Sequence, residues 1–174
     1  MTIHRALLLL ITAVHAGWHP VSAQVDRRLD AIQSIQQHER AAVLAVIDRY
    51  FATMAARDSA GMRAILTNEG MFHGKYTDAP EQPARLMPHG PYLHNLGRDT
   101  VPLLERYWDP VVYLEGPIAT VTTPYDFYVG RKLKHCGIDH FTLVKEADGW
   151  KISGGVFTMQ RTGCPASPLG PAYE

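Results

Sequence analysis

The sequence predicts an α+β domain in which helices come first and an antiparallel sheet follows. Two observations support this fold class. Residues 39–57 carry apolar side chains at steps of three and four, which is the period of an amphipathic helix. From residue 111 onward, apolar and β-branched segments alternate with turn residues, as in a strand meander. A chain of this kind is expected to pack its helices on one face of the sheet.

The first half of the chain is predicted to be mostly helical. A weaker apolar stripe extends the helix over 39–57 back toward Asp26. Asp58 is a suitable cap for a second, short helix that runs through residue 66, and Asn68-Glu69-Gly70 would end it. Residues 71–75 then form a short strand.

Between the helices and the meander, the sequence predicts a long connection. Four prolines favour a loop over 76–99, and loops of this length commonly act as lids or are disordered. Residues 100–107 suit a short helix, because Pro102 would fall in its first turn.

Four strands are predicted after this connection, over 111–114, 118–129, 133–145 and 150–161. Gly130-Arg131 and Asp148-Gly149 suit the two-residue turns that would join the last three strands. The tail from Pro165 is rich in proline and glycine, so we expect it to be flexible.

Length and charge limit the classes of function. The chain has 174 residues, enough for one domain, which we place at 24–164. Seventeen basic and 17 acidic residues give a formal net charge of zero, so the basic surface of a nucleic-acid-binding protein is absent. We expect no nucleic-acid partner and, after residue 25, no membrane span.

The N-terminus has the pattern of a secretory signal peptide. Arg5 precedes a short apolar run over 6–14, and Val21-Ser22-Ala23 places small residues before a cleavage site. We predict cleavage after Ala23 and export to the periplasm or the medium. The alternative is an uncleaved N-terminal anchor.

Export makes the two cysteines informative. Cys136 and Cys164 form an even pair, and an oxidising compartment favours a disulfide between them. Two reduced thiols are the alternative. No C-x-x-C motif occurs, so neither a redox site nor a cysteine zinc site is expected.

The two predicted turns fix a strand register and hence two faces of the sheet. Directly opposed residues point to the same face. The pairs that follow are Asp126 with His135, Thr122 with Asp139, Phe141 with Val156, and Asp139 with Thr158. This face has more aliphatic bulk, so we assign it to the interior, although a one-residue bulge would reverse the assignment locally.

On this register, Asp126 and His135 are the main candidates for chemistry. An aspartate beside an imidazole can fix its tautomer and prepare it as a base. Asp139 lies roughly 13 Å along the strand from His135, so it would act at another depth. A pair that only stabilises the sheet edge is an equal alternative, as is an internal hydrogen-bond cluster of Asp139, Thr122 and Thr158.

The remaining candidates come from the helix and the first strand. The predicted catalytic residues are His135, Asp126 and Asp139, and the predicted ligand-binding residues are Tyr50, His73, Thr122, Tyr128, Phe141, Val156 and Thr158. We expect neither a metal nor a cofactor, because His140 would point away from His135 and Asp139.

Several segments resemble a known family. The residues Ala42 to Phe51, Gly116 to Val121, Tyr125 to Tyr128, His135 to Leu143 and Gly149 to Ile152 are similar to nuclear transport factor 2-like, SnoaL-like proteins, above all to exported bacterial members labelled putative lumazine-binding. The resemblance spans about residues 39–164. It implies a cone-shaped, barrel-like α+β fold with an open-ended pocket.

The resemblance does not fix one function, since the superfamily includes isomerases, dehydratases, cyclases and simple binding proteins. Tyr50 and Asp139 loosely match the tyrosine and aspartate of ketosteroid isomerase, but the first strand offers His73 where that enzyme has an aspartate. Three hypotheses follow: an exported protein that binds a small organic molecule, an acid–base enzyme that uses His135 and Asp126, and a homodimer. The dimer would use the outer sheet face, with Phe127, Ile138 and Phe157 as its contact patch.

Overall fold

A computed structural model describes residues 21–173 of the chain, which forms two units, residues 1–36 and residues 37–174. The described part of the first unit is the beginning of helix α1, Val21–Ala55. The apolar run of the predicted signal peptide lies outside the described residues. Within 21–173, none of the helices combines the length and the apolarity that a bilayer crossing needs.

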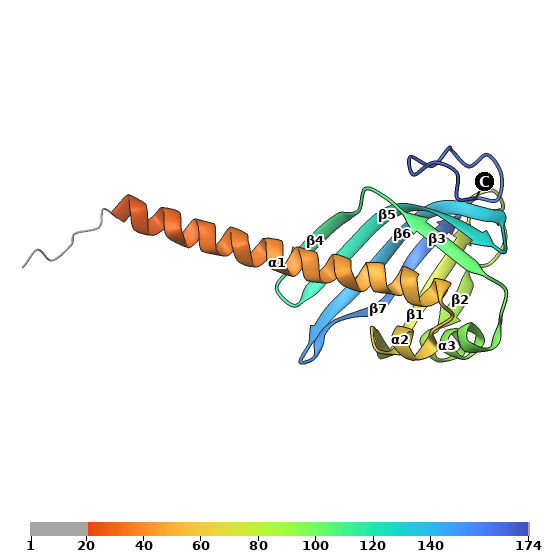
Figure 1. Cartoon of the computed structure of the whole chain (residues 1–174), viewed down its shortest axis with the longest axis horizontal. Coiled ribbons are helices and arrows are strands. Elements are labelled where there is room, and N and C mark those ends of the chain that lie inside the picture. The colour runs from red at the N-terminus through yellow and green to blue at the C-terminus, as the bar shows by residue number, and fades with distance from the viewer. Residues whose placement is uncertain (1–20, 174) are drawn as a thin grey trace, which may run out of the picture. The chain divides into compact units, whose positions relative to one another are not determined.

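The second unit contains the rest of α1, two short helices and a seven-stranded sheet (Figure 1). The elements after α1 are α2 (Ser59–Arg63), β1 (Leu66–Tyr76), β2 (Arg85–Pro88), α3 (His89–Arg98), β3 (Leu103–Tyr107), β4 (Val111–Glu115), β5 (Ile118–Val129), β6 (Lys132–Glu146) and β7 (Gly149–Met159).

The sheet is mixed, curved and open, with the strand order β2-β1-β7-β6-β5-β3. Strand β1 runs parallel to β7, and all other pairs are antiparallel. Strands β3 and β4 both pair with β5, at opposite ends of its length. The predicted α+β class is therefore confirmed.

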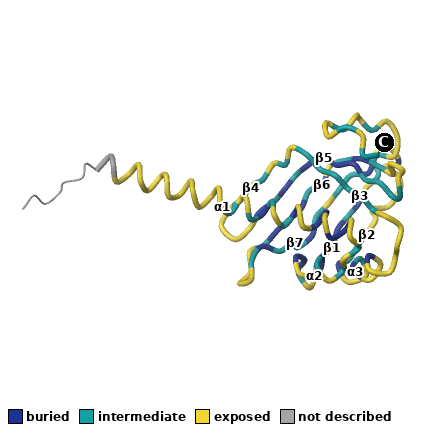
Figure 2. The backbone as a smooth tube through the Cα atoms, viewed as in Figure 1, coloured by how far each residue is buried: buried dark blue, intermediate teal, exposed yellow. Residues whose placement is uncertain are grey.

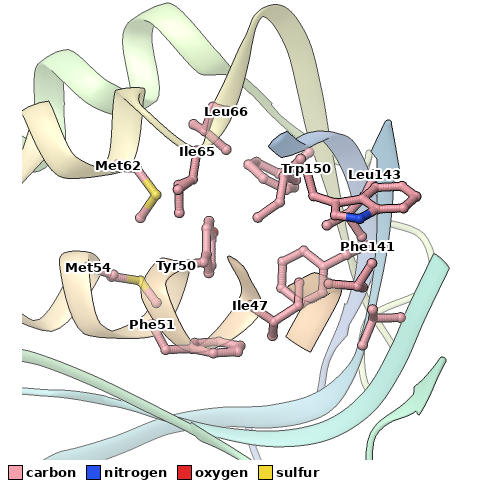
Figure 3. Close-up of a cluster of buried hydrophobic side chains, with 14 of the residues drawn as sticks. Ile47, Tyr50, Phe51, Met54, Met62, Ile65, Leu66, Phe141, Leu143 and Trp150 are labelled. Carbon is pink, nitrogen blue, oxygen red and sulfur yellow. The ribbon is translucent and has the colours of Figure 1, made fainter. Parts of the chain in front are cut away.

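The core lies between α1 and the concave face of the sheet. Helix α1 buries Val43, Ile47 and Met54 against side chains of β5, β6 and β7, among them Leu143 and Ile152. Figure 3 shows the side chains of α1 facing those of α2 and the strands. Each fully buried aliphatic side chain contributes about 1.5–3 kcal/mol, so this interface dominates the stability of the domain. Figure 2 shows the same burial along β1, β5, β6 and β7.

The second helix begins as predicted and ends earlier. Asp58 caps α2 by accepting a hydrogen bond from the amide of Gly61 at 2.8 Å. The helix ends at Arg63, and the residues predicted to stop it, 68–70, belong to β1. The reason is tertiary pairing, because Leu66 opposes Ile152 of β7 and draws the chain into the sheet.

Two predictions for residues 76–107 are wrong. The segment 76–99 contains β2 and α3 rather than one long loop, and the segment 100–107 contains strand β3 rather than a helix. Pro88 occupies the N-cap position of α3 without a capping hydrogen bond, and Pro91 lies in the first turn, where a missing amide hydrogen costs little. For β3, pairing with β5 overrides the weak local preference.

One hairpin turn forms as predicted and the other is shifted by one residue. Val129 opposes Lys132, which leaves Gly130-Arg131 as the loop. In the next hairpin Glu146 opposes Gly149, so the loop is Ala147-Asp148. Gly149 has a φ of 119°, a backbone conformation that favours glycine, and it follows the turn instead of forming part of it.

Two bulges reverse the predicted faces of β5 and of the second half of β7. Between β5 and β6 the register shifts between Phe127 and Tyr128, so that Phe127 opposes His135 and Asp126 opposes Cys136. Between β6 and β7 it shifts at Leu143, so that Phe141 opposes Gly155. Side chains alternate along a strand, and each shift therefore exchanges inward and outward residues on the partner strand.

Cys136 and Cys164 form a disulfide, as predicted, with their Cα atoms 5.9 Å apart. Beyond it, the C-terminal segment lies against β3 and β5. The guanidinium of Arg106 donates to the carbonyl oxygen of Gly170 at 3.0 Å, and the ring of Tyr173 packs against Tyr128. The disulfide thus attaches this segment to the outer face of the sheet.

Replacing both Cys136 and Cys164 by serine is expected to lower the free energy of unfolding by about 3.5 kcal/mol, because the crosslink closes a long loop in the unfolded chain. Urea denaturation measures the change. A reducing agent should destabilise the wild type and leave the double variant unaffected. Equal stability of the oxidised wild type and the variant would contradict this prediction.

Candidate functional site

A cavity of about 750 Å³ lies between the end of α1, helix α3 and the concave face of the sheet. Six aromatic side chains line it. Tyr50 comes from α1, Tyr92 from α3, and Phe72, Phe127, Phe141 and Phe157 come from four strands. The ring of Tyr50 contacts those of Phe72 and Phe141 at centroid distances of 5.7 and 5.2 Å. Flat rings therefore shape this part of the wall.

Two carboxyl groups meet beside these aromatic rings. Glu105 of β3 and Asp139 of β6 line the cavity, and their side chains are hydrogen-bonded to each other. Burial raises the pKa of Asp139 to about 8. Burial and the neighbouring Asp139 carboxylate also raise the pKa of Glu105 well above its usual value. The pair therefore retains at least one proton at neutral pH.

One oxygen of this pair is buried and has no hydrogen-bond partner among the described residues. Asp139 is only 6% exposed, and its Oδ2 atom has no hydrogen-bond partner among residues 21–173. Two tyrosine hydroxyls lie nearby, since Tyr92 donates to Tyr50 at 3.3 Å and both sense the charge of Asp139. An unpartnered buried oxygen is costly, and a ligand group that bonds to it would remove that cost.

His135 lines the same cavity on the strand that carries Asp139. Its ring stacks on Phe127, and its Nδ1 atom lies 2.9 Å from the hydroxyl oxygen of Tyr125. Burial, and then the charge of Arg85, lower the pKa of His135 to about 4. The imidazole is therefore neutral at physiological pH.

The rim of the cavity carries basic side chains. Arg57 donates to the carbonyl oxygen of Val101 and forms an ion pair with Asp99 at 3.6 Å. Arg85 of β2 is exposed, influences His135 and makes no ion pair with any of the described residues. Within 21–173, no three histidine, cysteine or acidic side chains converge as metal ligands do.

Half of the predicted site residues line the cavity. These are Tyr50, His135, Asp139, Phe141 and Val156, although Val156 is 53% exposed. The predicted pair of His135 with Asp126 is wrong, because the bulge in β6 turns Asp126 to the opposite face. There Asp126 accepts hydrogen bonds from Arg106 at 2.9 and 2.5 Å.

The other predicted contacts lie elsewhere. Tyr128 packs beneath the C-terminal segment, Thr122 bonds to His140 at 2.7 Å, and Thr158 accepts a hydrogen bond from the amide of Ile138. His73 pairs with Val156 and is not part of the lining. The predicted outer patch is also wrong in two of its members, since Phe127 and Phe157 line the cavity.

Sequence reasoning missed Glu105, Tyr92 and Tyr125. Glu105 was expected on a helix, but its segment is shorter than most helices and is bounded by prolines, which favours a strand. Tyr92 was expected in a loop, although His89, Leu93 and Leu96 recur at helical steps and are all buried. Tyr125 faces inward because of the same bulge that turns Asp126 outward.

Comparison with known proteins is consistent with this fold. A family model described as putative lumazine-binding matches residues 38–158, more than half of the chain. No curated protein matches the sequence. Several solved structures of similar fold are described as nuclear transport factor 2-like proteins.

One such structure, from Cytophaga hutchinsonii, has a TM-score of 0.60 at 10% identity and covers 70% of this chain and 98% of its own. Another, with a cystatin-like fold, comes from Novosphingobium aromaticivorans; it has a TM-score of 0.59 at 11% identity and covers 85% and 95%. A putative dehydratase from Streptomyces avermitilis has a TM-score of 0.54 at 16% identity and covers 68% and 93%. At these identities the likeness establishes the fold alone.

The buried carboxyl pair predicts an unusual pH dependence of stability. Because its pKa is raised on folding, Asp139 contributes stability that is fully present below pH 3.8 and is lost as the pH rises through about 8. Asp139→Asn removes this loss, so the free energy of unfolding of the variant should exceed that of the wild type by at least about 2 kcal/mol at pH 9. Urea denaturation at several pH values measures the difference. Glu69→Gln, at an exposed carboxylate, is the control, and parallel pH profiles for wild type and Asp139→Asn would contradict the prediction.

Proposed function

Because the chain belongs to the putative lumazine-binding family, we propose that its cavity binds a small, flat organic molecule. A volume of about 750 Å³ is within the range of small-molecule sites, and six aromatic rings line it. Flat rings pack well against other flat rings, which favours a planar ligand over a flexible chain.

The observation that carries this proposal is the unpartnered Oδ2 atom of Asp139, a buried residue that lines the cavity beside the aromatic rings. One proton forms the hydrogen bond between Glu105 and Asp139; while both carboxyls are protonated, the second proton can be donated to a carbonyl oxygen of the ligand. His135 lies on the same strand and is neutral, so it offers a second polar contact. The ligand we propose is therefore a planar heterocycle with a carbonyl group and an N–H group on its edge.

Lumazine, which is pteridine-2,4-dione, has both groups and is the probe we choose. Its affinity for the wild type and for Asp139→Asn would be measured by calorimetry from pH 7 to pH 9. One pH unit above its pKa, the carboxyl pair keeps its proton in only about a tenth of the molecules. The amide of asparagine can donate at any pH. The affinity of the wild type relative to the variant should therefore fall about tenfold across this range.

Comparing the two proteins at each pH removes any titration of the ligand itself. Glu69→Gln is the control and should follow the wild type throughout. A ratio that stays constant with pH would contradict the role of Asp139. If lumazine fails to bind, native mass spectrometry of protein purified from its own host should reveal a retained small molecule, and an empty cavity there would refute the proposal.

A second function, acid–base catalysis, is supported by the presence of a base and an acid in one cavity. His135 would accept a proton from a carbon acid, and the carboxyl pair would donate to the developing oxyanion. One solved structure of similar fold is described as a putative dehydratase. A base with a pKa of about 4 is weak at neutral pH, which is why we favour binding. His135→Ala should abolish turnover in an enzyme and only weaken affinity in a binding protein.

We also propose that the protein is exported. The N-terminal pattern of Arg5, an apolar run and Val21-Ser22-Ala23 supports export, and the disulfide suits an oxidising compartment. Protein isolated from its own host should begin at Gln24, which intact-mass measurement and N-terminal sequencing can test. A mature chain that still contains residues 6–14 would support the anchored alternative.

A further inference from the structure

The hydroxyl of Tyr125 lies between two possible hydrogen-bond partners. It is 2.7 Å from the carbonyl oxygen of Thr158 and 2.9 Å from Nδ1 of His135. Tyr125 itself is 1% exposed, so water does not compete for these contacts. A tyrosine hydroxyl has a single proton, and only one of the two contacts can receive it.

The chemistry of the partners decides which contact receives the proton. A carbonyl oxygen can only accept, whereas a ring nitrogen of histidine either donates or accepts. If Tyr125 donated to His135, two oxygens would face each other at 2.7 Å with no hydrogen between them. Both contacts are hydrogen bonds only if Tyr125 donates to Thr158 and His135 donates from Nδ1 to Tyr125.

The carbonyl of Thr158 is available because the β6–β7 ladder is interrupted at this point. Regular pairing ends at Asp139 with Phe157, and a single bridge resumes at Cys136 with Gln160. Between them, the amide of Ile138 donates to the side-chain hydroxyl of Thr158 at 2.9 Å instead of to a backbone carbonyl. The Thr158 carbonyl is left to accept from Tyr125.

Gly137 makes this interruption possible. It opposes Tyr125 across the β5–β6 ladder, and a Cβ atom at position 137 would lie 2.1 Å from the carbonyl oxygen of Thr158. Any side chain there would displace this oxygen. The glycine, the interrupted ladder and the tyrosine together form one supporting structure behind His135.

From this geometry we infer that Tyr125 is a positioning residue, which holds His135 as the tautomer protonated at Nδ1. The Nε2 atom then carries a lone pair, and the ligand must offer it an N–H or O–H donor. The inference about the tautomer concerns the ligand-free protein. Its meaning for recognition rests on the proposed function, in which His135 contacts the ligand.

The tautomer can be read from long-range proton–nitrogen correlation spectra of uniformly nitrogen-15-labelled protein at pH 7, with His135→Gln to identify the signals. The wild type should show Nδ1 protonated and Nε2 unprotonated. In Tyr125→Phe, loss of one hydrogen bond should lower the ratio of the two tautomers about fivefold. Gly137→Ala should have the same direction of effect, because it displaces the Thr158 carbonyl.

Tyr107→Phe is the matched control. Tyr107 opposes Tyr125 in the sheet, and its hydroxyl donates to Asp48 rather than to a cavity residue. This variant should leave the His135 tautomer unchanged. A wild-type spectrum with the proton on Nε2 would overturn the inference even if Tyr125→Phe did not fold, and so would a Tyr125→Phe spectrum identical to that of the wild type.

A lumazine titration of Tyr125→Phe separates this inference from the proposed function. If the tautomer changes and the affinity falls about fivefold, both are supported. If the tautomer changes and the affinity does not, the positioning role stands and the ligand contact of His135 is refuted. If the tautomer does not change, the positioning role is refuted, whatever the affinity.

Discussion

One extra residue in β6 determines which side chains of β5 face the core. Leu133 opposes Tyr128 and His135 opposes Phe127, so Lys134 has no partner on β5. Below this bulge, Tyr125 and Phe127 lie on the face of the sheet that carries His135, and the carboxylate of Asp126 lies on the opposite face, beside Arg106. The identity of the cavity wall, the pairing of Asp126 with Arg106 and the support behind His135 all depend on this single insertion.

The cavity combines aromatic rings with a few ionisable side chains. Aromatic rings come from six elements, and burial in this cavity raises the pKa of Glu105 and of Asp139 and lowers that of His135. A polar group in such surroundings has few alternative partners. Specificity for a ligand would therefore come from matching these few groups, while the rings supply most of the buried area.

More of the fold than of the site could be predicted from the sequence, for physical reasons. Strong local patterns gave the helix over 39–57, the cap at Asp58 and three of the four later strands nearly to the residue. The short strand with Glu105 has no periodic pattern of its own and forms through pairing with β5. Bulges leave no clear mark in a single sequence, so Asp126 was placed inside and Tyr125 outside, although Tyr50, His135 and Asp139 were placed correctly.

The parallel pairing of β1 with β7 has a consequence for the order of assembly. Residues 71–76 must wait for residues 154–159 before they can join the sheet, so the first strand of the chain depends on the last. Such long-range pairing closes late, because the entropy of a large loop has to be overcome first. The chain therefore cannot close its sheet during synthesis, and the last residues to leave the ribosome are the ones that complete the wall of the cavity.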